Sequence, residues 1–260
     1  VKDNRGLEAV KDLSFTVHQG EILGIAGVAG NGQTELIEAI AGLRKKEKGK
    51  IELCGKDITH SSPRDIRELG LSHIPEDRYK HGLVKEFPVY YNILLGRHYL
   101  PPFSKNGFLR HKQVYERAKF LVKQFDVRPP SILMLAENLS GGNQQKMVVG
   151  REIDYQPRCM LVAQPTRGLD IGAIEYIHRT LIGLRDAGVG LLLVSMELEE
   201  IFSLSDRILI MFEGEFMGEA KPGEITLEEI GLAMAGTPLA EVRKTEAASA
   251  GKSETTRVES

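Results

Sequence analysis

A glycine-rich loop near the start of the chain has the residue types and spacing of a phosphate-binding site. The run from Gly27 to Thr34, GVAGNGQT, matches the pattern G-x-x-x-x-G-K-[ST] except at one fixed position. Glycines let backbone N–H groups turn inward around a phosphate, and a following helix N-terminus adds partial positive charge. Thr34 stands where a hydroxyl binds Mg²⁺. The predicted phosphate-binding residues are Gly27, Gly30, Asn31, Gly32, Gln33, Thr34 and Glu35.

The one departure is Gln33, which occupies the position of the lysine. A hydrogen bond to a charged group is worth about 1.5–3 kcal/mol, against about 1 kcal/mol for a neutral one. The change alone therefore weakens phosphate binding by about tenfold or somewhat more. The loss is larger in a transition state, where charge builds on the transferred phosphoryl group. A turn from strand to helix that binds no ligand remains the alternative.

The elements around the loop predict a largely parallel sheet covered by helices. The apolar run 21–26 is typical of a strand buried on both faces, and 34–43 of a short helix. Leu13, Phe15 and Val17 alternate with polar residues and predict a half-buried strand before it. Further strands are expected at 50–53, 71–74, 159–163, 190–195 and 207–212, and helices from Ser62-Pro63, at 173–187 and at 197–204.

Two other segments differ from this alternation. Residues from about 87 to 152 have helical periodicity with an irregular insert at 100–107, which predicts a separate helical lobe. Thr226 and Glu229 form a capping box that opens a last helix. From Thr237 the chain is polar and small without periodicity. We therefore expect one domain over 1–236 and a disordered tail over 237–260.

Composition excludes several classes of function. Lysine and arginine number 34 against 36 acidic residues, so the net charge of −2 gives no basis for a nucleic-acid partner. Cys54 and Cys159 are far apart and are expected to be reduced thiols. No apolar run reaches the ~18–20 residues of a membrane span, so membrane association is expected through a partner. No metal-ligand spacing links the histidines at 73, 81, 98, 111 and 178.

A second glycine motif decides between a nucleotide site and a simple turn. Residues 139–145 read LSGGNQQ, in which Ser140 caps a helix and two glycines permit a close approach to phosphate. The motif resembles LSGGQ, the signature of ATP-binding-cassette (ABC) proteins. It lies in the predicted helical lobe, about 20 residues before the strand at 159–163, which is the order expected of such a protein.

The resemblance covers nearly the whole chain up to about Gly236. It is similar to the second, C-terminal cassette of the ATPase subunit of simple-sugar and nucleoside importers, and most similar to the nucleoside branch. The absence of an initiator Met fits a cassette that is part of a longer polypeptide. The runs that carry the resemblance are GIAGVAGNGQ at 24–33, IPEDR at 74–78, LSGGNQQK at 139–146 and AQPTRGLD at 163–170.

The resemblance implies an α/β fold, a P-loop NTPase cassette. Its parts are a RecA-like parallel-sheet core, an N-terminal antiparallel β subdomain and a helical signature subdomain. It also implies ATP or ADP as ligand, with Mg²⁺ weak or absent at the chain's own site. The family lies peripherally on the cytoplasmic face of the bacterial inner membrane.

Carried over residue by residue, the resemblance exposes a set of lost catalytic groups. Ala163 replaces the Walker B aspartate, and Gln164 replaces the glutamate that polarises water, whose general-base help is typically worth 10²–10⁴-fold. Met196 replaces the switch histidine and cannot donate a hydrogen bond to phosphate. Glu76 replaces the Q-loop glutamine and retains the ability to coordinate a cation. No adenine-stacking aromatic lies near Arg5, which is expected to stack instead or to be solvated.

These joint losses predict a hydrolytically inactive cassette that binds nucleotide weakly. We expect it to present its signature to ATP held by another cassette, the N-terminal half of the same polypeptide or a second cassette. In the family, the region from Glu76 to Arg97 lies against the transmembrane permease subunits, with packing between the two lobes as the alternative; an extracellular solute-binding protein takes part indirectly. The residues expected at the shared ATP are Ser140, Gly141, Gly142, Gln144 and the D-loop residue Asp170.

Two other functions remain open from the sequence. The first is an active ATPase in which Glu76 or Glu197 serves as the base. The second is a soluble cassette protein of the translation or repair type, which acts without a membrane partner. Such proteins normally carry two intact ATP sites and long charged linkers, and neither is present in this sequence.

Overall fold

A six-stranded sheet forms the centre of the protein. The computed structural model describes residues 1–245. The strand order is β10-β9-β1-β8-β7-β4, parallel throughout except for β10, which runs antiparallel to β9 at one edge. The bounds are β1 Ile22–Ala26, β4 Leu71–Ile74, β7 Cys159–Ala163, β8 Gly190–Ser195, β9 Arg207–Phe212 and β10 Glu215–Ala220.

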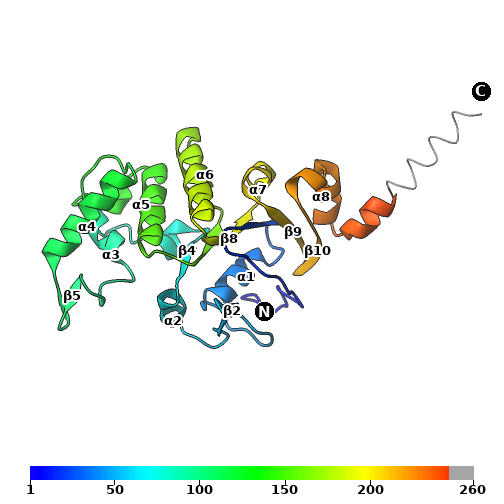
Figure 1. Ribbon diagram of the computed structural model, residues 1–260, viewed down its shortest axis with the longest axis horizontal. Coiled ribbons are helices and arrows are strands. Elements are labelled where there is room, and N and C mark those ends of the chain that lie inside the picture. The colour runs from blue at the N-terminus through cyan, green and yellow to red at the C-terminus, as the bar shows by residue number, and fades with distance from the viewer. Residues whose placement is uncertain (246–260) are drawn as a thin grey trace, which may run out of the picture.

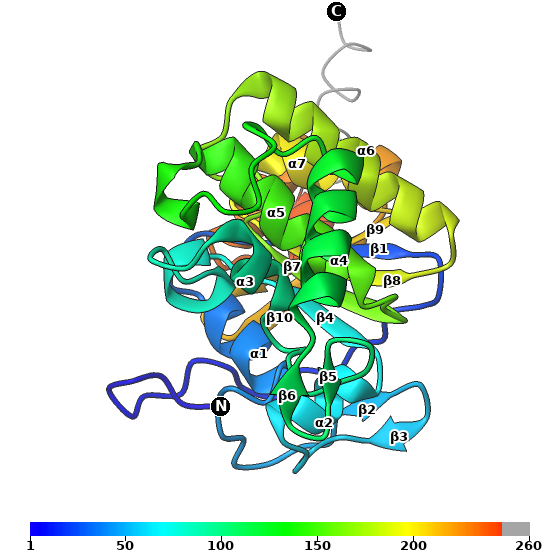
Figure 2. The same cartoon turned by 90° about the vertical axis from the view of Figure 1, so that its left-hand side faces the viewer.

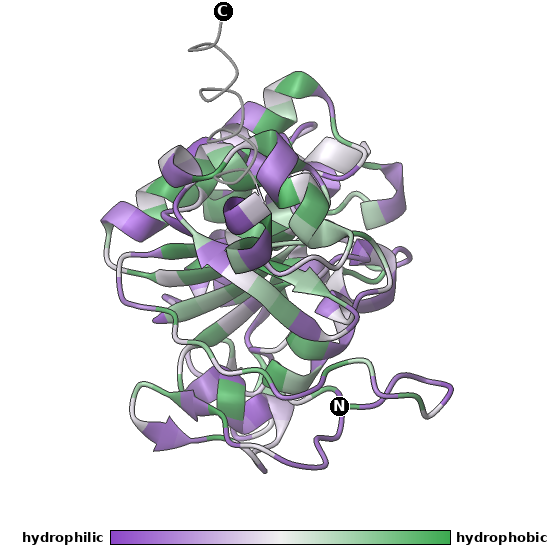
Figure 3. Cartoon of the chain, turned by 90° about the vertical axis from the view of Figure 1, so that its right-hand side faces the viewer, coloured by the Kyte–Doolittle hydropathy of each residue, from purple (hydrophilic) through white to green (hydrophobic). Residues whose placement is uncertain are grey.

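Helices cover both faces of the sheet, as Figure 1 shows. Successive strand residues point to opposite faces. Ile22 of β1 therefore packs in one hydrophobic core with α6 and α7, and Leu23 in a second core with α1 and α2. Hydrophobic colour concentrates in the strands between these layers (Figure 3). The helices are α1 Gln33–Ile40, α2 Pro63–Glu68, α5 Gly141–Asp154, α6 Ile171–Asp186, α7 Leu198–Leu204 and α8 Leu227–Met234.

A helical lobe stands beside the β4 edge of the sheet (Figure 2). Residues 87–152 contain α3 Val89–Leu94, α4 His111–Gln124, the 3₁₀ turn Ala136–Asn138 and most of α5. These elements share a core of their own, separate from the two cores of the sheet. The expected irregular insert at 100–107 includes part of a two-stranded hairpin, β5 Ser104–Lys105 and β6 Phe108–Leu109, above the buried ring of Phe103.

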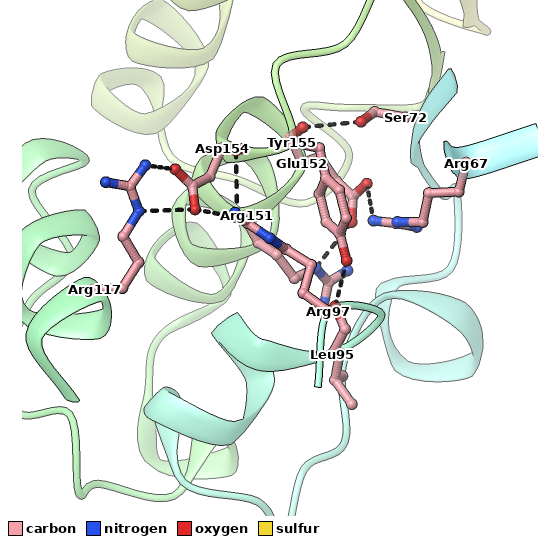
Figure 4. A network of polar contacts seen from close by, with 9 residues as sticks. All are labelled: Arg67, Ser72, Leu95, Arg97, Arg117, Arg151, Glu152, Asp154 and Tyr155. Carbon is pink, nitrogen blue, oxygen red and sulfur yellow. Dashed lines mark hydrogen bonds and ion pairs between the residues drawn. The ribbon is translucent and has the colours of Figure 1, made fainter. Parts of the chain in front are cut away.

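A buried polar network joins the lobe to the sheet domain (Figure 4). Glu152 of α5 is 0% exposed and accepts hydrogen bonds from Arg67 of α2 at 2.5 Å and from Arg151 at 2.8 Å. Asp154 pairs with Arg97 and Arg117. Buried carboxylates are stable only when they are paired in this way. The network therefore fixes where α5, and with it residues 139–145, lies relative to the sheet.

Two sequence expectations are wrong in the described residues. Leu13, Phe15 and Val17 alternate in burial as predicted, but the segment pairs with no strand, because burial on one face does not require a hydrogen-bonded neighbour. The tail was expected to be disordered from Thr237, yet residues 239–245 are helical, with Leu239 and Val242 buried against the sheet domain. The rest of that expectation, 246–260, lies outside the described residues.

Other local expectations are confirmed. Ser62 and Thr226 cap α2 and α8 with complete capping boxes. Both cysteines are free thiols, and burial raises the pKa of Cys159 to about 11. The antiparallel part that precedes the helical lobe is small, namely the pair β2 Glu52–Leu53 with β3 Lys56–Asp57 and a bridge between Lys2 and Glu8. Within residues 1–245, none of the helices has the length and apolar character that crossing a bilayer requires.

Candidate functional site

The glycine-rich loop lies at the carboxyl end of β1, where a parallel sheet places its ligand sites. Gly30 and Gly32 adopt φ values of +88° and +101°, which favour glycine. A Cβ added at Gly32 would lie 2.0 Å from the Ala9 carbonyl oxygen, so only glycine fits there. Asn31 braces the loop from outside, since its Oδ1 accepts from the N–H of Glu213 at 3.0 Å. The loop is therefore held open by its surroundings.

Gln33 points back into the loop instead of outward. Its side chain is 8% exposed, and its Nε2 donates to the Val28 carbonyl at 3.1 Å. A Cβ added at Gly27 would lie 2.3 Å from that same nitrogen. The amide thus bridges the two ends of the loop without bringing positive charge to it.

Three polar side chains form a chain across the mouth of the loop. The Thr34 hydroxyl donates to Glu76 Oε2 at 3.1 Å, and the Arg167 guanidinium donates to Glu76 Oε1 at 3.0 Å. Thr34 is the second residue of α1, which follows β1; Glu76 follows β4, and Arg167 follows β7. These three segments are far apart in the sequence. They meet because the strands that precede them, β1, β4 and β7, have their carboxyl ends on the same side of the sheet.

The altered Walker B and switch positions lie on the same cavity. Ala163 ends β7, and the next residue, Gln164, has φ +48° and accepts from the Met196 N–H at 3.4 Å. The cavity has a volume of about 620 Å³. Its wall includes Gly27, Gly30, Gln33, Thr34, Glu76, Ala163, Gln164, Arg167 and Met196.

Other predicted residues lie off that wall. Asn31 and Gly32 contact Glu213 and Ala9, on the side of the loop away from the cavity. Glu35 is half-buried on α1. Arg5 pairs with Asp3 at 2.9 Å and does not line the cavity. Within residues 1–245, no group of three or more His, Cys, Asp or Glu side chains is placed to hold a metal ion.

The signature residues form a second surface, separate from the cavity. Ser140 is exposed, and its Oγ accepts from the Asn143 N–H at 3.4 Å, while in the first turn of α5 Gly141 is half-buried and Gly142 is buried. Asp170 is the N-cap of α6. It lies close to the start of α5, because a Cβ added at Gly142 would be 3.3 Å from Asp170 Oδ2. Ser140, Gly141 and Asp170 are thus brought together, and all three lie outside the cavity wall.

Gln144 corrects one expectation about the signature. Its side chain is buried, its Nε2 donates to the Ala136 carbonyl at 2.9 Å, and its Oε1 accepts from Arg78 at 3.3 Å. Both polar atoms are used inside the lobe, so this side chain does not face a nucleotide. In an NQQ sequence, helical periodicity places Asn143 outward and Gln144 inward.

Comparison with known proteins decides the family. The sequence profile of the ABC transporter family matches residues 10–167, more than half of the 260-residue chain. The chain belongs to the ABC transporter family. The cassette superimposes with a TM-score of 0.71, at 21% identity, on a dimeric ATP-binding cassette, MJ0796, in a post-hydrolysis state bound to ADP and Pi. That match covers 82% of this chain and 90% of the other, and it shows the ABC cassette fold.

Two curated relatives are more similar in sequence. The guanosine import ATP-binding protein NupO of Bacillus subtilis (strain 168) is 54% identical over 244 residues, 94% of this cassette and 48% of that protein. The nucleoside import ATP-binding protein NupA of Lactococcus lactis subsp. cremoris (strain MG1363) is 49% identical over 236 residues, 91% of this cassette and 47% of that protein. The cassette therefore spans about half the length of these relatives.

The loop of this ABC cassette fits the phosphates of a nucleotide on structural grounds. The loop runs into the N-terminus of α1, where the first backbone N–H groups of the helix lack intrahelical partners and can donate to phosphate oxygens. Thr34 and Glu76 present oxygen atoms, which Mg²⁺ prefers, 3.1 Å apart. Gln33, Thr34 and Glu76 would hold the nucleotide and its metal from this side.

Among the cavity residues that the sequence prediction missed, Arg167 and His73 are of chemical interest. Arg167 lies in the AQPTRGLD run but had no assigned role; a cation four residues after a parallel strand's end was the available signal. His73 on β4 also lines the cavity, and its Nε2 has no partner among the described residues. Burial lowers the pKa of His73 to about 4, so its ring is uncharged at neutral pH. A histidine inside a strand gave no functional signal.

Proposed function

We propose that this cassette is the catalytically degenerate half of a nucleoside importer ATPase, which lends its signature to ATP bound by a second cassette. The observation that carries the proposal is the contrast between its two surfaces. The cavity has no carboxylate at the end of β7 and no histidine after β8. At the start of α5, in contrast, Ser140 and the neighbouring Asp170 are exposed and Gly141 is half-buried.

Each lost group removes a separate part of hydrolysis. Ala163 offers no oxygen to a metal shell, and the amide of Gln164 is not a base. The substitute bases are poorly placed. Glu76 already accepts from Thr34 and Arg167, and Glu197 lies off the cavity wall. Nucleotide therefore binds weakly at this cavity and is not turned over there.

The signature surface has the features that phosphate recognition needs. The first N–H groups of α5 have no intrahelical partners, and the helix dipole places partial positive charge at that end. Ser140 adds a hydroxyl, and Gly141 and Gly142 carry no side chains of their own. The Arg78 guanidinium lies beside them, 2.8 Å from where a Cβ on Gly141 would stand. We assign the partner as the N-terminal cassette of the same polypeptide, because the relatives are about twice as long as this chain.

The other partners follow from the importer relatives. NupO and NupA are named for guanosine and nucleoside import, so nucleosides are the proposed cargo class. Permease subunits would contact the region from Glu76 to Arg97, where Tyr79 and Phe87 are exposed. Leu83 and Val89 of that region instead pack into the core of the helical lobe itself. The cassette would lie on the cytoplasmic face of the membrane.

The test is ATP hydrolysis by this chain alone and together with its proposed N-terminal partner. Alone, phosphate release should be negligible. With the partner, Gly141→Asp should abolish the stimulated turnover, because a carboxylate repels the bound triphosphate. Gly183→Asp on α6 is the matched control, since a side chain there meets nothing within 4 Å.

Two results would refute the proposal. The first is robust turnover by this chain alone that disappears in Thr34→Ala. The second is unchanged turnover of the complex carrying Gly141→Asp, with the variant folded and associated as the control is. Loss of all turnover when the lysine of the partner's own phosphate loop is replaced would support the assignment of the working site to the partner.

A further inference from the structure

The cavity lacks the expected lysine and aspartate, but a cationic and an anionic side chain still pair on its wall, those of Arg167 and Glu76. Arg167 and Glu76 line it and lie 3.0 Å apart, one hydrogen bond from the loop hydroxyl of Thr34. We propose that Arg167 binds the phosphates of a nucleotide in this cavity, in place of the lysine that Gln33 replaces. In the nucleotide-bound state Arg167 would give up its hydrogen bond to Glu76 and bind the phosphates, and the Glu76 carboxylate would be free to bind Mg²⁺. The inference rests on the weak nucleotide binding proposed above.

The backbone beneath Arg167 is fixed while its side chain is free. On one side, Thr166 Oγ1 donates to the buried Glu200 at 2.8 Å. Gln145 of α5 donates to the Pro165 carbonyl at 2.9 Å. The Arg167 side chain is 63% exposed, and its guanidinium makes a single hydrogen bond, to Glu76, among the described residues. Arg167 is thus held at the cavity with four of its five N–H donors available.

No other cation on the wall has this connection to the loop. Arg78 is engaged by Gln144 at 3.3 Å and lies over the ring of Tyr79. The ring of His73 is uncharged at neutral pH. Lys80 lines the cavity but contacts neither the loop nor Glu76 among the described residues. Arg167 is the cation joined to Thr34 through one shared carboxylate.

The exchange follows from charge balance. In the structure the arginine and the carboxylate neutralise each other, so neither is left unpaired. Phosphate oxygens are bidentate acceptors that suit a guanidinium, and a carboxylate beside a threonine hydroxyl suits Mg²⁺. The pair together carries the same net charge as the missing lysine and aspartate. Binding that uses both groups must therefore depend on Mg²⁺ as well as on Arg167.

The test measures equilibrium binding of ATP and AMP to the full chain, with and without Mg²⁺, by competition against a fluorescent ATP analogue. Arg167→Ala should weaken ATP binding about tenfold and leave AMP binding within about twofold, because the arginine reaches the outer phosphates. Arg167→Lys should recover part of the loss. Glu76→Gln should remove the gain that Mg²⁺ gives to ATP binding. Arg179→Ala, an exposed arginine of α6 outside the cavity, is the control.

Several outcomes would overturn the inference. Equal ATP affinity in Arg167→Ala and the unaltered chain is one, and equal losses for ATP and AMP is another. A loss in Lys80→Ala instead of Arg167→Ala would move the cation to Lys80. If the unaltered chain binds no ATP, the inference fails while signature lending stands, because that function is read separately from partner-dependent turnover. Melting temperatures of all variants exclude unfolding as the cause.

Discussion

Glu152 links the helical lobe to the sheet domain, and its replacement should lower the free energy of unfolding more than most single substitutions. Its carboxylate is 0% exposed and accepts from Arg67 at 2.5 Å, from Arg151 at 2.8 Å and from the His73 N–H at 3.4 Å. Arg151 is itself only 6% exposed. In Glu152→Ala, two guanidiniums keep their charge in a buried place without the anion that compensates it (Figure 4).

The expected loss is large for a single substitution. Each hydrogen bond between charged groups is worth about 1.5–3 kcal/mol, so two of them give about 3–6 kcal/mol. Breaking one side of a buried pair typically costs about 3–5 kcal/mol, which agrees. Glu152→Gln keeps the shape and one acceptor oxygen, so about half of that loss is expected. Urea unfolding at pH 7 measures the free energies of unfolding. The comparison requires that the dependence of the free energy on urea concentration (the m-value) be the same for both variants.

The pH dependence supplies an independent check. Burial alone raises the pKa of Glu152, but Arg151 and Arg67 outweigh it and hold the pKa below its ordinary value of 4.5. The contribution of the carboxylate is therefore complete above pH 4.5 and falls as the pH drops through the lower folded pKa. The gap between the unaltered chain and Glu152→Gln should shrink over that acid range. A loss below about 1 kcal/mol at pH 7 in Glu152→Ala would refute the reasoning.

Three further predictions concern the cavity and the glycine-rich loop beside it. The folded pKa of His73, about 4, lies below its ordinary 6.5, so the unfolded chain takes up the proton first as the pH falls; unfolding free energy should drop about 3 kcal/mol more than in His73→Gln between pH 7 and 4. Parallel pH curves would contradict this. Gln33→Lys should tighten ATP binding about tenfold without detectable phosphate release, because Gln164 and Met196 remain; measurable turnover would show that the lysine was the limiting loss. Gly32→Ala, whose new Cβ meets the Ala9 carbonyl at 2.0 Å, should lose at least about 1 kcal/mol more stability than Gly30→Ala, where φ is also positive but the space is open; equal melting temperatures would contradict it.

The position of the signature shows how local and tertiary information combine. The sequence LSGGNQQ predicts a capped helix with a glycine-flanked start, and Ser140 does cap α5. The resemblance to the ABC signature placed Gln144 among the residues expected at the shared ATP. Only the packed lobe shows that its amide serves Ala136 and Arg78 internally. A polar residue next to a functional motif has two possible uses, and burial decides between them.

The edge strand β10 and the end of the chain show the opposite difficulty. Residues 215–220 include two glutamates and a glycine, a composition that gives no strong strand signal, yet they pair with β9. Leu239 fills a site beside Gly218 and shares a hydrophobic core with Ile230 of α8, and Val242 is also buried. Both segments owe their structure to surfaces already formed by the rest of the domain, which a local pattern does not contain.

The sequence by itself determined the parallel strands, the loop at Gly27–Thr34, the signature, and the chemical losses at Gln33, Ala163, Gln164 and Met196. The strands and the loop follow from periodicity and from residue type, which are local properties. The signature and the losses at those four positions are what the resemblance to ABC cassettes implies. Only the tertiary structure decided that the losses share one cavity with Arg167, and that Glu76 lies between that arginine and Thr34. The physical reason is that the carboxyl ends of the parallel strands β1, β4 and β7 lie on the same side of the sheet. The strand order that brings these ends together is set by packing across the whole domain.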